Sequence, residues 1–414
     1  MQETFWTEIR IKKVRHLSEI SIPLSEISRK HLILTGKNGS GKTSVLNALA
    51  DHLQYIISDE FEQPNRILTY GTMLNELLDN PDKKNDERKI DAALKKQEIL
   101  LNKWSSGAVS VCNSFDDMRT KYKEGQFLLA YYGVNRQTQV EEYKNIEKIS
   151  LKNVYKPTDA PGTKFTKYLV DLKATQAFSR GSEKAKKIDE WFENFEQILK
   201  RVFQDSTLRL IFDEETFQFS LYEKDREPFD FNTMASGYSA AFDIIDDLIM
   251  RMEASKGLRM KFDMEGIVLI DEVETHLHLD LQKEILPILT GIFPNIQFII
   301  STHSPFVLNS LGNAVIYDLE KKLLVPEGLQ NLPYEGIVEG YFGADRLSQK
   351  LRGKFERYKT LVHKELLSDE EYAEIEELEY YLDEIPDYLA IEIATEYSRM
   401  KNEFSTRESL NDKD

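Results

Sequence analysis

The sequence is poor in cysteine, glycine and proline. Its 414 residues include one cysteine, Cys112, together with 19 glycines and 12 prolines. A single cysteine excludes an intrachain disulfide framework and a zinc site built from cysteines, which fits a reducing compartment. The small number of turn-forming residues for this length favours long helices.

Long apolar runs are also missing. No run approaches the about 20 residues that a bilayer-spanning helix needs, and the N-terminal segment MQETFWTEIRIKKVR contains no apolar signal core. We therefore expect a cytoplasmic protein that is neither secreted nor embedded in a membrane. Hydrophobic residues still make up 41% of the chain, which is enough to form a sizeable core.

The sequence has fewer positively charged than negatively charged residues, with 54 lysines and arginines against 71 aspartates and glutamates. The formal net charge is −17, so the protein as a whole should not be attracted to a nucleic-acid backbone without a localised basic groove. Lysine pairs at 83–84, 95–96 and 186–187 are interleaved with acidic residues, and we interpret them as solvated helix faces.

What the sequence does contain is a complete phosphate-binding loop. The pattern G-x-x-x-x-G-K-[ST] occupies residues 36–43, after a short apolar run at 32–34 and before a segment with helical spacing. Glycines let backbone N–H groups turn toward phosphates, and the start of the next helix presents its positive end to them. We expect a nucleotide to bind through Gly36, Asn38, Gly39, Ser40, Gly41, Lys42, Thr43 and Ser44.

Two side chains of this loop have chemical roles. Lys42 would neutralise the β and γ phosphates and so assist hydrolysis, and the Thr43 hydroxyl would contact Mg²⁺. The loop therefore predicts a nucleotide and Mg²⁺ as cofactors, and the family resemblance given below implies that the nucleotide is ATP.

A second cluster begins with GIVLIDEVETHLHLD. The apolar run 267–270 ends in Asp271 and Glu272, and a buried parallel strand would deliver these carboxylates to the ligand-binding edge of an α/β sheet. This resembles the Walker B element. On that resemblance Asp271 holds Mg²⁺ through water, and Glu272 orients or deprotonates the attacking water.

Two further motifs carry polar groups at element ends. His303 follows the apolar strand of NIQFIISTHSPFVL, where an imidazole can donate a hydrogen bond to the terminal phosphate. Ser236 and Gly237 stand before an amphipathic helix and can cap an anion, which we expect to be the nucleotide of a second subunit. His276 and His278 lack the spacing and the companions of a metal site.

The order of the predicted elements gives an α/β fold. Residues 4–35 alternate apolar and polar positions, which predicts an antiparallel β layer leading into a parallel core. We expect an ATPase head over residues 1–330, with helical insertions at about 71–124 and 164–205, and a helical C-terminal segment over 331–414.

The chain resembles the ABC-type ATPase heads of the RecF, SMC and OLD group. The resemblance covers most of residues 4–320 and rests on four elements in the same order: Gly36–Thr43, Ser236–Gly237, Asp271–Glu272 and His303. In that group two heads sandwich two ATP molecules, and the signature serine of one subunit meets the γ-phosphate bound by the other. The resemblance thus implies an ATPase that forms an ATP-dependent dimer or higher oligomer with itself.

The segment DEVETHLHLDLQ, followed by STHSPFVL, is similar to the prokaryotic branch of the group. That branch includes OLD nucleases and the ATPase subunits of antiphage systems such as Septu and PARIS. Tyr238, in place of the usual glutamine of transporter ATPases, argues against a transporter subunit. No acidic nuclease motif follows residue 320, so we expect an effector such as a nuclease on a separate chain, with the helices after about residue 346 either as its docking surface or as a packed subdomain.

Some assignments stay open from sequence alone. By its position after the strand at 127–132, Gln137 matches the Mg²⁺-contacting glutamine of the family, but Gln139 and Arg136 compete for this role. A DNA repair or maintenance ATPase of the RecF/SMC type is an alternative to the defence role, as is a scaffold that holds ATP as a structural ligand.

Overall fold

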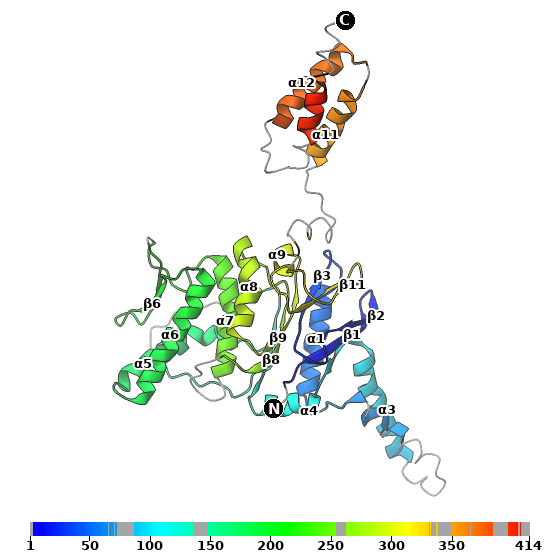
Figure 1. Cartoon of the computed structure of the whole chain (residues 1–414). Coiled ribbons are helices and arrows are strands. Elements are labelled where there is room, and N and C mark those ends of the chain that lie inside the picture. Colours follow the sequence, from blue (N-terminus) through cyan, green and yellow to red (C-terminus); the bar gives the residue numbers. More distant parts are fainter. Residues whose placement is uncertain are drawn as a thin grey trace. The chain divides into compact units, whose positions relative to one another are not determined.

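A central sheet of parallel strands with one antiparallel edge strand forms the core of the computed structural model (Figure 1). The strand order is β11-β10-β3-β9-β8-β5, and only β11 runs antiparallel to its neighbour. The strands are β3 (His31–Thr35), β5 (Phe127–Tyr132), β8 (Glu265–Ile270), β9 (Ile296–Ser301), β10 (Ala314–Asp318) and β11 (Leu323–Val325). The structure describes residues 3–64, 66–69, 71–72, 87–135, 147–224, 226–253, 262–330, 332, 337, 349–364, 366–383, 396–404 and 406.

An antiparallel layer precedes the core sheet, as expected from the alternation in residues 4–35. It consists of β1 (Trp6–Val14), β2 (Leu17–Pro23) and β4 (Gly107–Cys112), with β1 in the centre. The segment at about 71–124, where we expect a helical insertion, also contributes a strand, because β4 pairs with β1 between α3 (Glu87–Ser105) and α4 (Phe115–Lys123). The six residues GAVSVC bury three consecutive side chains in this layer.

One buried glutamine joins the antiparallel layer to the core sheet. The side chain of Gln297 in β9 accepts a hydrogen bond from Trp6 N–H at 2.7 Å and donates to the Trp6 carbonyl at 2.9 Å. It also donates to the carbonyl of Lys30, just before β3, at 2.7 Å. A side-chain amide therefore replaces the backbone partners that Trp6 would otherwise need.

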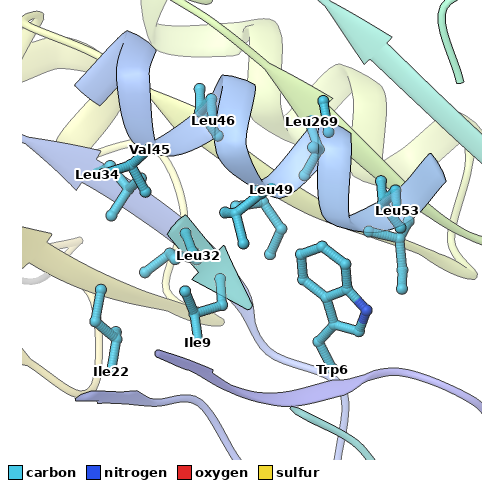
Figure 2. Packing of buried hydrophobic residues seen from close by; sticks show 14 of the residues in the cluster. Trp6, Ile9, Ile22, Leu32, Leu34, Val45, Leu46, Leu49, Leu53 and Leu269 are labelled. Carbon is cyan, nitrogen blue, oxygen red and sulfur yellow. The ribbon is translucent and has the colours of Figure 1, made fainter. Parts of the chain in front are cut away.

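Helix α1 (Lys42–Ile57) packs within a core that both sheets share. Figure 2 shows Leu49 and Leu53 of α1 near Trp6 of β1, with Leu32 of β3 in the same cluster. Trp6 is fully buried. This packing fixes the first turn of α1, which carries Lys42, against the end of β3.

The chain between β5 and β8 adds a largely helical region. An aromatic stripe on α6, which includes Trp191 and Phe195, is buried as the helical periodicity predicts. The elements are η2 (Pro161–Lys164), α5 (Phe165–Phe178), α6 (Glu183–Phe203), the hairpin of β6 (Arg209–Phe212) and β7 (Phe219–Tyr222), and α7 (Ser236–Glu253). Helix α8 (Leu279–Ile292) connects β8 with β9, and α9 (Pro305–Leu308) follows β9.

The chain divides into two compact units, Met1–Leu332 and Pro333–Asp414. The second unit contains α11 (Gln349–Val362), α12 (Asp369–Asp383) and helical residues 396–404. These helices enclose their own core around Tyr358, Leu378 and Met400. Among the described residues of both units, no helix has the length and apolar character of a membrane span.

Candidate nucleotide-binding site

The predicted site residues follow three neighbouring parallel strands. β9 lies between β3 and β8, so the loops after all three strands emerge at the same edge of the sheet. The loop after β3 carries the phosphate-binding motif, β8 leads into Asp271 and Glu272, and β9 leads into His303. The structure thus brings together the three motifs that are far apart in the sequence.

The phosphate-binding loop uses its glycines for conformation and for close approach. Gly36, Gly39 and Gly41 have φ angles of 130°, 85° and 102°, in a region that side chains disfavour. A Cβ on Gly41 would lie 2.9 Å from Leu17 Cδ1, and one on Gly36 would lie 2.9 Å from Ser40 Oγ. The path of the backbone into α1 therefore requires glycine at both positions.

Lys42 is folded onto its own loop. Its ammonium donates to the carbonyl of Gly36 at 2.8 Å and to that of Lys37 at 3.2 Å, and it lies 3.5 Å from Nδ1 of His303. Burial lowers the pKa of Lys42, while the charges of nearby acids, Glu272 first among them, oppose this shift. Lys42 and His303, 261 residues apart, are thus within reach of one phosphate group.

Asp271 is fully buried, with one oxygen bonded and the other not. Oδ1 accepts a hydrogen bond from Ser301 Oγ at 2.5 Å. Oδ2 has no hydrogen-bond partner in the described part of the chain. A buried, unpartnered carboxylate oxygen beside a phosphate-binding loop fits a divalent cation or its water ligand, since hard cations prefer oxygen donors.

Glu272 occupies a strained position at the turn after β8. Its φ angle is 45°, in the left-handed region. Its backbone N–H donates to Ser301 Oγ at 2.8 Å, and its carboxylate accepts from Thr275 Oγ1 at 3.2 Å. These bonds hold a conformation that a glutamate would not adopt unaided, and strain of this kind is common at functional sites.

His303 is partly buried beside the same loops. Its backbone N–H donates to Glu274 Oε1 at 2.5 Å. Burial first, and then the charge of Lys42, lower the pKa of His303. A neutral imidazole at neutral pH is thereby favoured, with Nδ1 facing the lysine.

The Ser236–Gly237 pair begins α7, and its two residues differ in exposure. Ser236 is the first residue of the helix and is exposed, whereas Gly237 is buried. A Cβ on Gly237 would lie 2.9 Å from His278 Cδ2 and 3.1 Å from the carbonyl oxygen of His276. The signature therefore packs on the segment that follows Asp271 and Glu272, a contact that the sequence did not predict.

The sequence reasoning missed two residues of this site. Ser301 binds Asp271 and Glu274 binds the backbone of His303, yet the motifs predict roles only for their neighbours. The signal available was a third acid two positions after Glu272 and a hydroxyl at the end of β9. Gln137, like Arg136 and Gln139, lies outside the described residues.

A known protein family matches more than half of the chain. Residues 81–309 match the family described as "AAA domain, putative AbiEii toxin, Type IV TA system". The chain belongs to this family. The matched range includes Asp271, Glu272 and His303 and begins after the phosphate-binding loop.

The curated relatives of this chain include a Septu protein and a retron probable ATPase. The Septu protein PtuA of Bacillus mycoides (strain KBAB4) is 27% identical over 390 residues, which cover 89% of this chain and 48% of the relative. The retron Ec83 probable ATPase of Escherichia coli is 29% identical over 225 residues, which cover 48% of this chain and 42% of the relative. The chain thus spans about half the length of these relatives or less.

Solved structures give a weaker likeness. An SMC head bound to the C-winged helix domain of ScpA has a TM-score of 0.36 and 13% identity, and covers 76% of this chain and 94% of its own. A nucleotide-free ATP-binding cassette from an ABC transporter has a TM-score of 0.32 and 14% identity, and covers 77% and 87% respectively.

Proposed function

We propose that this chain is an ATPase that binds Mg·ATP at the edge formed by the ends of β3, β9 and β8. The observation that carries the proposal is the 3.5 Å approach of Lys42 Nζ to His303 Nδ1, next to the buried and unpartnered Oδ2 of Asp271. A lysine, a neutral imidazole and a free carboxylate oxygen, converging on a glycine-rich loop, suit a triphosphate with a divalent cation.

Each residue has a defined role in this proposal. Lys42 exchanges its loop carbonyls for phosphate oxygens, and His303 donates a hydrogen bond to the terminal phosphate. Asp271 and Thr43 would hold Mg²⁺, which neutralises charge that develops on the phosphates. Glu272 orients the attacking water and accepts its proton.

We further propose that the complete site needs a second copy of the chain. Ser236 is exposed at the first turn of α7, where its hydroxyl and the helix N-terminus are available to a nucleotide on another subunit. In this arrangement ATP lies between two heads, and its binding or hydrolysis changes the association of the subunits.

The biological role that we propose is that of a sensor or switch subunit in an antiphage defence complex. Its support is the likeness to a Septu protein and to a retron probable ATPase. An effector such as a nuclease would then be carried by a separate chain, and the second unit, 333–414, is our candidate for its docking surface.

The test is light scattering combined with ATP turnover for the unmutated chain and for Glu272→Gln. We expect Mg·ATP to raise the mass, and Glu272→Gln to bind ATP, lose turnover and accumulate in the larger form, because the proton acceptor is gone while binding groups remain. Ser236→Arg is the matched variant, and it should bind ATP but stay at the lower mass. Wild-type turnover in Glu272→Gln would remove this residue from the mechanism, and an ATP-independent mass would refute the switching dimer.

A further inference from the structure

Two loops of the site are tied to each other by hydrogen bonds in both directions. The loop after β8 carries Asp271 and Glu272, and the loop after β9 carries His303. A side chain at the end of β9 binds the loop after β8, and a side chain in the loop after β8 binds the loop after β9. These side chains are Ser301 and Glu274, neither of which is expected to touch the nucleotide.

Ser301 contacts three consecutive residues of the β8 loop. Its hydroxyl donates to Asp271 Oδ1 at 2.5 Å and accepts from the Glu272 N–H at 2.8 Å, and its carbonyl accepts from Val273 N–H at 3.1 Å. Ser301 is fully buried. Because Oδ1 already accepts this hydrogen bond, Oδ2 is the oxygen of Asp271 that is left without a hydrogen-bond partner among the described residues, and the serine fixes the orientation of the carboxylate.

Glu274 makes the return contact. Its Oε1 accepts the backbone N–H of His303 at 2.5 Å, while Oε2 is buried without a hydrogen-bond partner among the described residues. The backbone of the same loop is also anchored to the phosphate-loop strand, since Thr302 N–H donates to the Leu34 carbonyl at 3.0 Å. The position of the imidazole therefore depends on the β8 loop on one side and on β3 on the other.

We propose that Ser301 and Glu274 form a reciprocal latch that positions Asp271, Glu272 and His303 for hydrolysis. The inference rests on the proposed function. Ser301 holds Glu272 in its left-handed conformation and aims Asp271, and Glu274 sets the distance between His303 and Lys42. Both are positioning residues, because they act through the groups that would meet the phosphates.

The first experiment measures hydrogen exchange of the backbone amides in the nucleotide-free full chain. Ser301→Ala should speed exchange of residues 271–275, and Glu274→Ala should speed exchange at 302–304, because each variant removes an acceptor or an anchor from the opposite loop. Ser110→Ala is the matched control, since Ser110 is a fully buried serine whose hydroxyl has no hydrogen-bond partner among the described residues. Unchanged exchange in both loops overturns the latch, whether or not the chain hydrolyses ATP.

The second experiment separates positioning from stability. Ser301→Ala and Glu274→Ala should lower kcat at least about tenfold while ATP affinity stays within about threefold, since small displacements of reacting groups cost far more in rate than in binding. Glu274→Gln keeps an oxygen acceptor for the His303 N–H and should restore turnover to within about threefold of wild type. Glu284→Ala, at an exposed site on α8, is the control.

The outcomes distinguish the proposed ATPase function from the proposed latch of Ser301 and Glu274. Faster exchange with wild-type kcat overturns the positioning role, and failure of Glu274→Gln to restore turnover overturns the role of its acceptor oxygen. If the unmutated chain binds ATP but shows no turnover, the proposed hydrolysis fails, and the exchange data still decide whether the latch exists. If Glu274→Ala shows no cooperative thermal unfolding, Glu274→Gln is measured in its place. Its amide exchange at residues 302–304 should match that of wild type.

Discussion

At the scale of single residues, Lys42 is hydrogen-bonded to the backbone of its own loop. Lys42 bonds two carbonyls of the loop and approaches His303, so the ammonium is not left unpaired while it is buried. A buried cation without partners would be strongly disfavoured. An incoming phosphate therefore competes with the carbonyls of Gly36 and Lys37 for Lys42, and affinity reflects the difference between the two sets of contacts.

Two buried histidines predict acid sensitivity. Burial lowers the pKa of His31, with a smaller effect of the Arg29 charge, and burial lowers that of His52, in each case from 6.5 to about 4. Above pH 6.5 both rings are neutral in either state. As the pH falls, the unfolded chain takes up protons first, so folding stability is lost between pH 6.5 and about 4.

At pH 5 we expect each histidine to lower the free energy of unfolding by about 2 kcal/mol relative to pH 7.5. Urea unfolding at several pH values measures this dependence. His52→Leu removes one titrating group and should flatten the curve over this range. A curve as steep as that of wild type would show that His52 is not the group responsible.

At the scale of elements, the side chain of Gln297 supplies backbone hydrogen bonds that a neighbouring strand would otherwise supply. Gln297→Leu leaves Trp6 N–H and the carbonyls of Trp6 and Lys30 without their side-chain partner. We expect the free energy of unfolding to fall by about 3 kcal/mol or more, because each buried orphaned group costs about 1–3 kcal/mol. Urea unfolding measures the loss, and the exposed Gln218→Leu serves as control. A change within that of the control would mean that the antiparallel layer is held by other contacts.

Elements with a clear hydrophobic pattern could be predicted from the sequence, whereas elements with a weak pattern could not. The stripe of α6 is buried at the positions that helical spacing predicts, and β3, β8 and β9 are continuous apolar runs that are buried along almost their whole length. β4 was missed because six residues between charged helices give no alternation, and its pairing with β1 spans about a hundred residues of chain.

The residues of the candidate site also fall into those that the sequence predicts and those that it does not. Lys42, Asp271, Glu272 and His303 were predicted because each follows a recognisable strand or motif, although their roles stay predictions. Ser301 and Glu274 were not, because their contacts arise only when β8 and β9 pair in the observed register, with Ile270 opposite Ile300. Local sequence carries no direct record of that register.

At the scale of the whole molecule, every described residue of the proposed site lies in the first unit. The second unit encloses its own core, with paired charges such as Arg357 and Glu374 on its surface. We therefore expect a chain cut to residues 1–332 to fold and to bind ATP with affinity within about threefold of the full chain, since compact units with separate cores fold independently.

Calorimetric titration with Mg·ATP, alongside circular dichroism of both pieces, checks this expectation. Residues 333–414 alone should show a helical spectrum. Loss of ATP binding in 1–332, with its fold intact, would place part of the nucleotide site in the second unit and contradict the division proposed for the chain.

The contact between Gly237 and the turn before α8 has a consequence for how this protein can change over generations. Position 237 has no room for even a methyl group while His278 keeps its ring there. A larger residue at 237 becomes acceptable only after 278 has become smaller or the turn has moved. The two positions are therefore expected to change together over generations, because each limits the size of the side chain that the other can carry.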